Sequence, residues 1–263
     1  MRKPELLVPA SSLEVLKIAT VFGADAVYIG GEAFGLRAKA RNFSKEEMAQ
    51  GIAFAHEHGV KVYVTVNILA HNYDLEGVRE YLKELKELKP DALIIADPGI
   101  FTYAKEICPE IERHISTQAN NTNYETYRFW YNLGAKRVVS ARELSLEELS
   151  RMHQASPIEI EAFVHGALCY SYSGQCLMSS LLGGRSGNRG RCAQPCRLPY
   201  QVKNFKTRDY GKGEFCPLSL KDICTIEILP QIIEAGVTSL KIEGRMKQPS
   251  YTAGVTGMYR KYL

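Results

Sequence analysis

The sequence lacks any apolar run that approaches the roughly 20 residues a helix needs to cross a bilayer, so we predict no membrane segment. A signal peptide is not indicated either, because Pro4, Glu5 and Pro9 interrupt the apolar residues of the N-terminus. We therefore expect a cytoplasmic protein, and the reducing cytosol argues against disulfides among its seven cysteines. The net charge of +4 is mild: it permits a nucleic-acid partner without indicating one.

Two motifs that would narrow the function are also missing. No G-x-G-x-x-G fingerprint is present, so nothing indicates a dinucleotide-binding domain. No HExxH motif is present, so a zinc metalloprotease of that type is not indicated. The fold and the function therefore have to be argued from periodicity and from the cysteines.

A pattern that recurs eight times consists of a helical stretch, a turn and a short apolar run. The eight runs are Leu6–Pro9, Ala26–Gly30, Val60–Asn67, Ala92–Asp97, His114–Gln118, Arg137–Arg142, Ile158–His165 and Ser239–Glu243. Such short and nearly continuous apolar runs are typical of parallel strands buried on both faces. Between them lie amphipathic patterns such as Ser44–His58 and Leu75–Leu88, and the first of these begins with a capping-box pair, Ser44 and Glu47.

Eight strands that alternate with helices predict a parallel sheet closed into a (β/α)8 TIM-like barrel. The 263 residues fit this fold, since such barrels commonly have roughly 250. An open doubly wound sheet is the alternative, but eight repeats without a dinucleotide fingerprint favour closure. The last helical stretch, Ser250–Leu263, would supply the eighth helix, and we expect a single barrel domain over residues 1–263.

A glycine-rich insertion interrupts the regular spacing between strand 7 and helix 7. The eighth run begins about 80 residues after the seventh, more than twice any other interval. We place this insertion at about residues 167–216. Long loops that follow barrel strands lie on the C-terminal face, where active sites are built, so the insertion is expected to lie over the mouth of the barrel.

The insertion carries four cysteines in the order Cys169-x6-Cys176-x15-Cys192-x3-Cys196. Four thiolates suit a tetrahedral zinc ion or an iron–sulfur cluster, because both prefer soft sulfur donors. Structural zinc sites more often use two short Cys pairs, and only one pair here is short, which favours iron–sulfur. Cys216 and Cys224 compete with Cys196 for the fourth position, whereas Cys108, near a helix end, reads as a core thiol.

A second group of candidates follows the predicted strands and would meet at the mouth of the barrel. Its members are Asn67, Asp97, Ser116, Thr117, Gln118, Arg142, Glu143, His165, Glu243 and Arg245. They predict a polar, anionic ligand held by Arg142, Arg245 and Lys247, although some could instead satisfy one another in buried salt links. The candidate catalytic residues are His165, Arg142 and Arg245, and the candidates for binding a cofactor or co-substrate are Lys247, Gln118 and Asn67. His165 could equally be an acid–base group or a hydrogen-bonded structural histidine.

A third feature is the basic stretch from Arg185 to Arg208, which also contains Tyr200 and Phe205. Basic residues with interspersed aromatics can bind a phosphate backbone and stack on bases. A solvated loop face is the alternative of equal weight, and the stretch gains interest because it adjoins the cysteines.

The segment EAFVHGALCYSYSGQCLMS at Glu161–Ser179 resembles the signature of the collagenase-like U-32 peptidase family. Further segments that resemble the family are PELLVPA, GADAVYIGG, STQ, NRGRCAQPCR, PLSLKD and SLKIEGRMK. The resemblance therefore covers essentially the whole chain. Many members of the family continue into a small C-terminal β-domain, which we expect this chain to lack.

Several members of that family are RNA or quinone hydroxylases, and the chain looks most like the tRNA hydroxylation proteins, which form 5-hydroxyuridine at the wobble position. The resemblance implies oxygen-independent hydroxylation with a 4Fe-4S cluster on Cys169, Cys176, Cys192 and Cys196, and prephenate as the co-substrate that supplies the oxygen. It implies tRNA as the partner, and a partner protein of the same family is a further expectation.

Three alternatives remain beside the tRNA hydroxylase. Hydroxylation of a cytidine in 23S ribosomal RNA would use the same chemistry. A collagenase-like peptidase would need a thiolate with a histidine base, and His165 lies only four residues from Cys169. A non-enzymatic, metal-stabilised RNA-binding module would use the four thiolates for structure alone.

Overall fold

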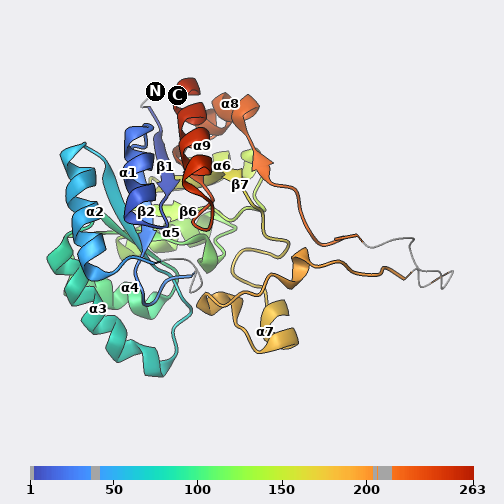
Figure 1. Ribbon diagram of the computed structural model, residues 1–263, viewed down its shortest axis with the longest axis horizontal. Coiled ribbons are helices and arrows are strands. Elements are labelled where there is room, and N and C mark those ends of the chain that lie inside the picture. Colours follow the sequence, from blue (N-terminus) through green and yellow to red (C-terminus); the bar gives the residue numbers. More distant parts are fainter. Residues whose placement is uncertain (1–2, 37–41, 204–205, 207–214) are drawn as a thin grey trace.

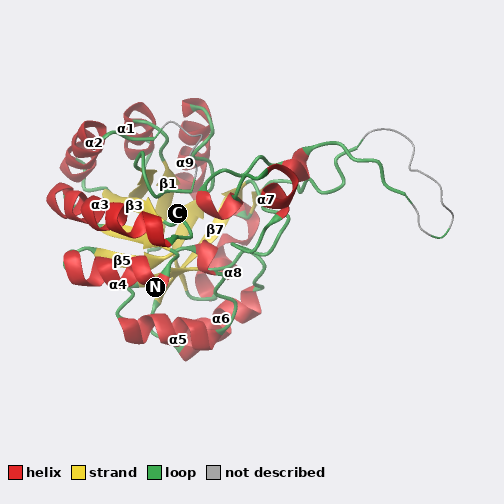
Figure 2. Cartoon of the chain, turned by 90° about the horizontal axis from the view of Figure 1, so that it is seen from below, coloured by secondary structure: helices red, strands yellow, loops and turns green. Residues whose placement is uncertain are grey.

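The computed structural model describes residues 3–36, 42–203, 206 and 215–263. Eight parallel strands close into a barrel, and helices surround it (Figures 1 and 2). Around the ring the order is β1, β2, β3, β4, β5, β6, β7 and β9, and β9 pairs with β1 to close it. The predicted (β/α)8 barrel is confirmed for the described residues.

The strands agree with the apolar runs of the sequence to within a few residues. Their bounds are β1 Glu5–Pro9, β2 Ala26–Gly30, β3 Lys61–Val66, β4 Ala92–Ile95, β5 Glu112–Ile115, β6 Arg137–Val139, β7 Glu159–Gly166, β8 Ile223–Cys224 and β9 Val237–Ile242. The strand predicted at Ser239–Glu243 is β9. The two-residue β8 is not part of the ring, because it adds to the edge of β7 in the antiparallel sense.

The helices are α1 Leu13–Val21, α2 Lys45–Glu57, α3 Leu75–Leu88, α4 Pro98–Ile107, α5 Tyr124–Leu133, α6 Leu146–Ala155, α7 Met178–Gly183, α8 Leu229–Glu234 and α9 Pro249–Tyr262. Several of these helices begin at a residue whose side-chain oxygen caps the first turn by accepting a hydrogen bond from a backbone N–H. The capping residues are Ser12, Ser44, Asp97, Asn123 and Ser145. The predicted capping box at the start of α2 is confirmed. None of the described helices combines the length and the apolar character needed to cross a membrane.

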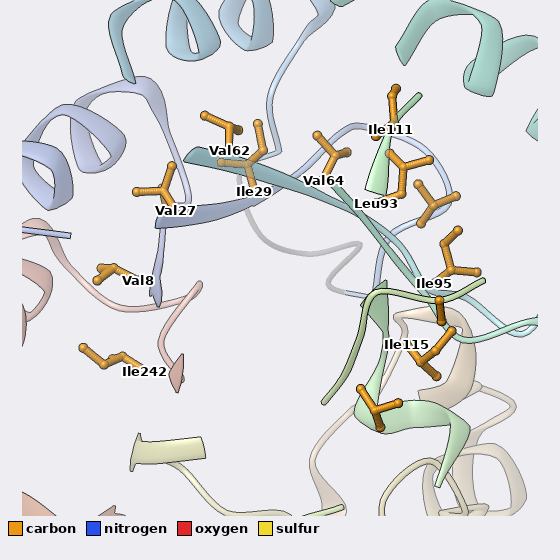
Figure 3. Packing of buried hydrophobic residues seen from close by; sticks show 14 of the residues in the cluster. Val8, Val27, Ile29, Val62, Val64, Leu93, Ile95, Ile111, Ile115 and Ile242 are labelled. Atoms are coloured by element: carbon orange, nitrogen blue, oxygen red, sulfur yellow. The ribbon is translucent and has the colours of Figure 1, made fainter. Parts of the chain in front are cut away.

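The main apolar core lies between the barrel and its helices. Successive strand residues point to opposite faces, and the outward set is almost entirely aliphatic (Figure 3). It includes Val8, Val27, Ile29, Val62, Val64, Leu93, Ile95, Ile115 and Ile242, each at most 1% exposed. Burial of each such side chain contributes roughly 1.5–3 kcal/mol, so this layer holds the helices against the barrel.

The inward faces of the strands are more polar than is usual for this fold. A small apolar cluster occupies part of the interior and consists of Leu7, Ala26, Tyr28, Tyr63, Ala92 and Ile94. Several of the remaining inward positions hold ionisable side chains, whereas barrel interiors are commonly filled by Val, Ile and Leu. The near-continuous apolar runs of the sequence therefore conceal a charged interior contributed by β1, β6, β7 and β9.

Arg137 is the centre of that interior network. Its guanidinium lies 2.6 Å from a Glu5 carboxylate oxygen, 2.9 Å from Glu159 and 3.3 Å from Glu161. The second oxygen of Glu161 accepts a hydrogen bond of 2.7 Å from Lys241. Glu161 is completely buried and both cations are at most 5% exposed, so each charge depends on its partners for compensation.

Hydrogen bonds complete the environment of Glu5 within this network. Tyr63 donates to one carboxylate oxygen at 2.6 Å and Ser239 donates to the other at 2.8 Å. Burial alone would raise the pKa of the Glu5 carboxyl, but the charge and hydrogen bonds of Arg137, with those of Tyr63 and Ser239, outweigh burial and hold the pKa below its ordinary value. Glu5 is therefore an anion in the folded protein near neutral pH.

We predict that Glu161→Ala lowers the free energy of unfolding by about 3–5 kcal/mol, because it leaves two buried cations without their shared carboxylate. Equilibrium urea denaturation followed by circular dichroism measures the change. The matched control is Glu147→Ala, which breaks an exposed pair with Arg151 on α6 and should cost no more than about 1 kcal/mol. Equal losses in the two variants would show that the interior network does not stabilise the barrel.

Candidate functional site

A small cavity of about 40 Å³ lies at the C-terminal mouth of the barrel. It is lined by Tyr28, Leu36, Thr65, Asn67, Ile94, Ser116, Thr117, Gln118, Arg142, Phe163, Lys241, Glu243 and Arg245. Four of the six predicted site residues outside the cysteines, Asn67, Gln118, Arg142 and Arg245, therefore meet here. This end of a barrel is where catalytic residues are found in essentially all enzymes of the fold.

A larger cavity of about 610 Å³ opens at the opposite end of the barrel. Its lining includes Glu5, Arg137 and Glu159, whose charges already satisfy one another in the interior network. Side chains that already neutralise one another have little capacity to bind a ligand. Active sites of this fold also lie at the C-terminal face, so the smaller mouth cavity is the better candidate site.

Arg245 is fixed at the mouth by contacts from β2 and β3. It is only 6% exposed, donates a hydrogen bond of 2.9 Å to the Thr65 hydroxyl, and donates another to the Leu36 carbonyl. Gly30 makes room for it, because a Cβ atom at that position would stand 2.3 Å from Nη1 of Arg245. The guanidinium is thus held in one place by residues on neighbouring strands.

The amide side chains of the mouth are fixed in a similar way. Asn67 accepts from the Leu36 N–H at 3.1 Å and donates to the Ser116 hydroxyl at 3.1 Å. The same hydroxyl accepts from the backbone N–H of Gln118 at 3.3 Å. These bonds connect the ends of β3 and β5 across the intervening β4, so polar groups from separate strands form one preorganised rim.

Arg142 and Lys241 bring two further cations to the cavity. The Arg142 guanidinium lies 4.3 Å from the centre of the Phe163 ring, and Lys241 Nζ lies 4.4 Å from the centre of the Tyr28 ring. Within the described part of the chain the buried Nε of Arg142 has no hydrogen-bond partner. With Arg245 these side chains make the mouth suited to an anionic ligand that can accept hydrogen bonds.

Lys241 was not among the site residues predicted from the sequence. Its neighbours Leu240 and Ile242 are buried, and Lys241 is the one charged residue inside the apolar β9 run. A lysine flanked by core residues in a barrel strand must point toward the axis, and that alternation was the available signal.

His165 and Lys247 are placed elsewhere, although both were expected at the mouth. The β7–β9 register shifts between Phe163 and His165, and such an irregularity turns the following side chain to the other face. The His165 ring consequently lies against α9, with Nδ1 3.4 Å from the Tyr259 hydroxyl. Burial lowers the pKa of His165, and the Lys247 charge lowers it further against an opposing effect of Asp222. Lys247 itself is exposed and lies 4.0 Å from Asp222.

Among the other residues predicted near the strand ends, Asp97 has a structural role. Its carboxylate caps α4 by accepting from the N–H groups of Gly99 at 2.8 Å and Ile100 at 3.1 Å, and its other oxygen accepts from Ala70. This carboxylate is committed to local structure and does not line the mouth cavity as described.

Beyond β7 the chain leaves the barrel as residues 167–203, which we call the cysteine segment. It contains α7 and short helical turns and lies beside the barrel (Figure 1). Ser173 fixes its first part, because its hydroxyl donates to Glu143 at 2.9 Å and accepts from the Arg142 N–H at 3.3 Å. Gly174 then approaches the backbone of Gln118 so closely that a Cβ atom would stand 2.0 Å from its carbonyl oxygen.

A second contact fixes the later part of the cysteine segment to the loop after β3. Arg189 makes a bidentate pair with Asp74 at 2.7 and 2.9 Å and donates to the Leu69 carbonyl at 2.8 Å. The Leu69 N–H in turn donates to the Asn188 carbonyl at 2.9 Å. The segment is thus attached to the barrel near β3, β5 and β6, around the mouth cavity.

The four predicted cysteine ligands lie near one another in the cysteine segment. Burial raises the pKa of the Cys196 thiol; Arg197 opposes this, and charges on Cys169, Cys192 and Cys176 raise the pKa further. The other three thiols thus lie within electrostatic range of Cys196. The Gln194 N–H also points to Cys192 Sγ at 3.4 Å, the kind of contact that a sulfur ligand accepts.

The four thiols are therefore chemically suited to bind a metal ion or cluster. Their sulfur atoms are not arranged around a single point in this structure. Across the described residues no three His, Cys, Asp or Glu side chains already stand at metal-binding positions. Cys224 lies in β8 and interacts with Tyr259 of α9, away from the four, and Cys216 is exposed. Cys108 is buried, and burial raises its pKa to about 11, as expected of a core thiol.

Part of the predicted basic stretch is involved in structure. Arg197 donates to the Leu168 and Leu220 carbonyls and to the Ser219 hydroxyl. These bonds connect the beginning and the end of the chain that runs outside the barrel between β7 and β8. Phe205 and Arg208 lie outside the described residues.

Comparison with known proteins gives relatives over the full length of the chain. Residues 11–263 match the family described as Peptidase family U32. The tRNA hydroxylation protein P1 of Bacillus subtilis is 46% identical over all of this chain and 63% of its own length. The 23S rRNA 5-hydroxycytidine C2501 synthase of Escherichia coli is 43% identical over 98% of this chain and 39% of its own length. The chain thus spans less than two thirds of these relatives.

Solved structures resemble the chain in fold. A U32 peptidase, Mk0906, superposes with a TM-score of 0.61 at 15% identity, over 92% of this chain and 93% of that one. Thiamine phosphate pyrophosphorylase from Pyrococcus furiosus superposes with a TM-score of 0.55 at 13% identity, over 98% and 94%. At these identities the likeness establishes the barrel architecture alone.

We predict that Gly174→Ala detaches the first part of the cysteine segment from the mouth. The glycine has a φ of +75°, and the added Cβ would meet a backbone oxygen that cannot swing away. Limited trypsin digestion should cleave after Arg185 and Arg191 at least about tenfold faster, which corresponds to roughly 1.4 kcal/mol. Gly183→Ala, where a Cβ meets nothing within 4 Å, is the control and should digest like the wild type. Equal digestion of both variants would contradict the docking contact.

Proposed function

This chain belongs to peptidase family U32, and on that premise we propose that it is the barrel portion of an RNA-modifying hydroxylase that acts on tRNA. The observation that carries the proposal is the gathering of four thiols in a segment attached around a cationic barrel mouth. A redox-capable sulfur site next to an anion-binding cavity suits hydroxylation better than peptide hydrolysis, because a thiol that binds metal is not a free nucleophile.

The names of the relatives support RNA as the substrate. Proteins from Bacillus subtilis, Escherichia coli and Helicobacter pylori that are 46%, 38% and 42% identical are named tRNA hydroxylation proteins. The ribosomal RNA relative, at 43% identity, carries out a related base hydroxylation by its name. We favour tRNA, with 5-hydroxyuridine at the wobble position as the product, and ribosomal RNA is the outcome that would replace it. Such a substrate places the protein in the cytoplasm.

We propose that Cys169, Cys176, Cys192 and Cys196 hold a 4Fe-4S cluster. When bound, such a cluster supplies electron transfer at a potential set by the hydrogen bonds and charges around its sulfurs. The chain's own residues set that environment: the Gln194 N–H lies at Cys192 Sγ, and the Arg197 charge lies next to Cys196.

We further propose that the mouth cavity binds the anionic co-substrate, with prephenate as the candidate. Arg142, Lys241 and Arg245 would bind its carboxylates, and the rim amides of Asn67 and Gln118 would orient it. The cavity volume of about 40 Å³ is well below the roughly 300 Å³ of an ordinary small-molecule site, so its lining side chains must separate on binding. The chain spans 63% of the Bacillus subtilis P1 protein and 39% of the ribosomal RNA synthase, and we propose that the remaining parts of such proteins, or a partner of the same family, contribute to RNA binding.

We predict that anaerobically purified protein contains about four iron and four sulfide per chain. Cys176→Ala and Cys196→Ala should each lose most of that iron and the visible absorbance, because each removes one thiolate ligand. Cys224→Ala and Cys216→Ala are the matched controls and should retain it. A colourless protein with stoichiometric zinc would rule out the redox site. Loss of iron in Cys224→Ala, with retention in Cys196→Ala, would show that Cys224 and not Cys196 is the fourth ligand.

We predict that deletion of the gene removes 5-hydroxyuridine from tRNA nucleosides, as measured by mass spectrometry. Complementation with the wild-type gene should restore the nucleoside, and Cys176→Ala should restore none of it. Arg142→Gln should restore it at least about tenfold less well, because one charge-assisted contact of roughly 1.5–3 kcal/mol is lost. Unchanged tRNA together with loss of a hydroxycytidine from ribosomal RNA would move the substrate to the ribosome.

A further inference from the structure

The chain between β7 and β8, which contains the cysteine segment, exposes an unusual share of large apolar side chains. Of the twenty exposed large hydrophobic residues in the described part of the chain, nine lie between β7 and β8. They are Tyr170, Tyr172, Leu177, Leu181, Leu182, Leu198, Val202, Phe215 and Leu220. An exposed apolar surface of this kind next to a candidate site usually marks a contact with a partner.

The first part of this region carries charge of one sign in its sequence. The 47 residues from Ala162 to Arg208 contain seven Lys or Arg and neither Asp nor Glu. The rest of the chain keeps 26 of the 33 basic residues and all 29 acidic residues, so its net charge is −3. The mild overall charge of +4 therefore hides a polarised molecule, with its positive charge next to the barrel mouth.

Two of the basic side chains in the cysteine segment are not neutralised by a carboxylate in the described structure. Arg189 pairs with Asp74, but Arg185 donates its Nε to the Arg191 carbonyl at 3.1 Å, and Arg191 is exposed. A positively charged surface that keeps its charge without local acids is complementary to a polyanion, because binding releases the counterions condensed on the phosphates.

Tyr170 and Tyr172 are exposed aromatics in the part of the cysteine segment that is attached at the mouth. They are 55% and 67% exposed and lie between Cys169 and Cys176. The next residue, Ser173, is hydrogen-bonded to Glu143 and to the Arg142 N–H, so the two tyrosines stand at the edge of the mouth. An aromatic ring held in water beside a reactive site offers a face on which an unpaired base can stack, for roughly 1–3 kcal/mol per base.

We propose that Tyr170 and Tyr172 form a platform on which unpaired RNA bases stack, while Arg185 and Arg191 bind the flanking phosphates. The identity of the ligand as RNA rests on the proposed function. The excess of positive charge, with Arg185 and Arg191 not paired to a carboxylate in the described structure, favours RNA over a protein partner. The tyrosines favour unpaired RNA over a duplex, because the bases of an A-form helix are stacked on one another and leave no free face.

Binding of a fluorescein-labelled RNA hairpin with an unpaired loop, and of a duplex of equal length, by the full holoprotein tests the platform. The hairpin should bind more tightly. Tyr170→Ala and Tyr172→Ala should each weaken hairpin binding by about 5- to 100-fold, with little effect on the duplex. The corresponding changes to Phe should retain binding, since the ring face remains.

Two controls separate stacking from charge. Tyr131→Ala removes a tyrosine of similar exposure, 48%, from α5 and should leave RNA binding unchanged. Arg191→Gln should weaken hairpin and duplex alike and reduce the slope of log K against log salt by about one. Circular dichroism confirms that each variant retains the fold.

The outcomes distinguish this platform from the proposed function. If the wild type hydroxylates tRNA in cells but the tyrosine variants bind the hairpin normally, the platform is overturned while the function stands. If no nucleoside is hydroxylated but hairpin binding still depends on the tyrosines, the platform stands without the function. If the tyrosine changes instead dissociate a dimer in sedimentation velocity, the surface is a contact between two copies, and the RNA platform is overturned.

Discussion

The buried ion network of the barrel is the constraint on which the rest of the structure depends. Glu5 comes from β1, Arg137 from β6, Glu161 from β7 and Lys241 from β9. In the ring these four strands are consecutive, and they include the seam at which the last strand meets the first. A buried charge without its partner costs several kcal/mol, so the network is satisfied only when all four strands are in register. Closure of the barrel and compensation of the charges are therefore one requirement.

The same network sets the electrostatics of the mouth. Glu161 is paired with Arg137 on the side of the barrel floor and with Lys241 on the side of the cavity. Lys241 is thus held from below, with its Nζ between the Tyr28 and Phe163 rings, and it faces the cavity together with Arg142 and Arg245. Cations that are already fixed lose little entropy when an anion binds, and this preorganisation is what an anion-binding site needs.

Local sequence patterns were sufficient for the elements but not for the orientation of every side chain. The capping box of α2 and the bounds of α3 follow from residues within one turn, and the eight apolar runs became the eight barrel strands. His165 was predicted at the mouth because it stands at the end of the seventh apolar run. In the structure a register shift within β7 turns its side chain toward α9. That shift depends on how β7 pairs with β9, which lies far away in sequence. Lys241 was missed although its place between buried residues of β9 was a local signal, and its pairing with Glu161, 80 residues distant, became visible only in the fold.

The attachment of the cysteine segment separates the position of the thiols from their chemistry. Among the described residues, the contacts that fix the segment to the barrel are made by Ser173 with Glu143, Gly174 with Gln118, and Arg189 with Asp74, and not by a cysteine. The contacts with the barrel therefore fix the position of the cysteine segment relative to the mouth. The thiols themselves are not needed for that attachment and remain available to bind a ligand. Arg142 and Gln118 belong to both regions, because their backbone atoms contact the cysteine segment and both residues line the cavity. The cavity and the cysteine segment thus share two residues, and such a physical connection is needed if binding at the cavity is to influence reactivity at the thiols.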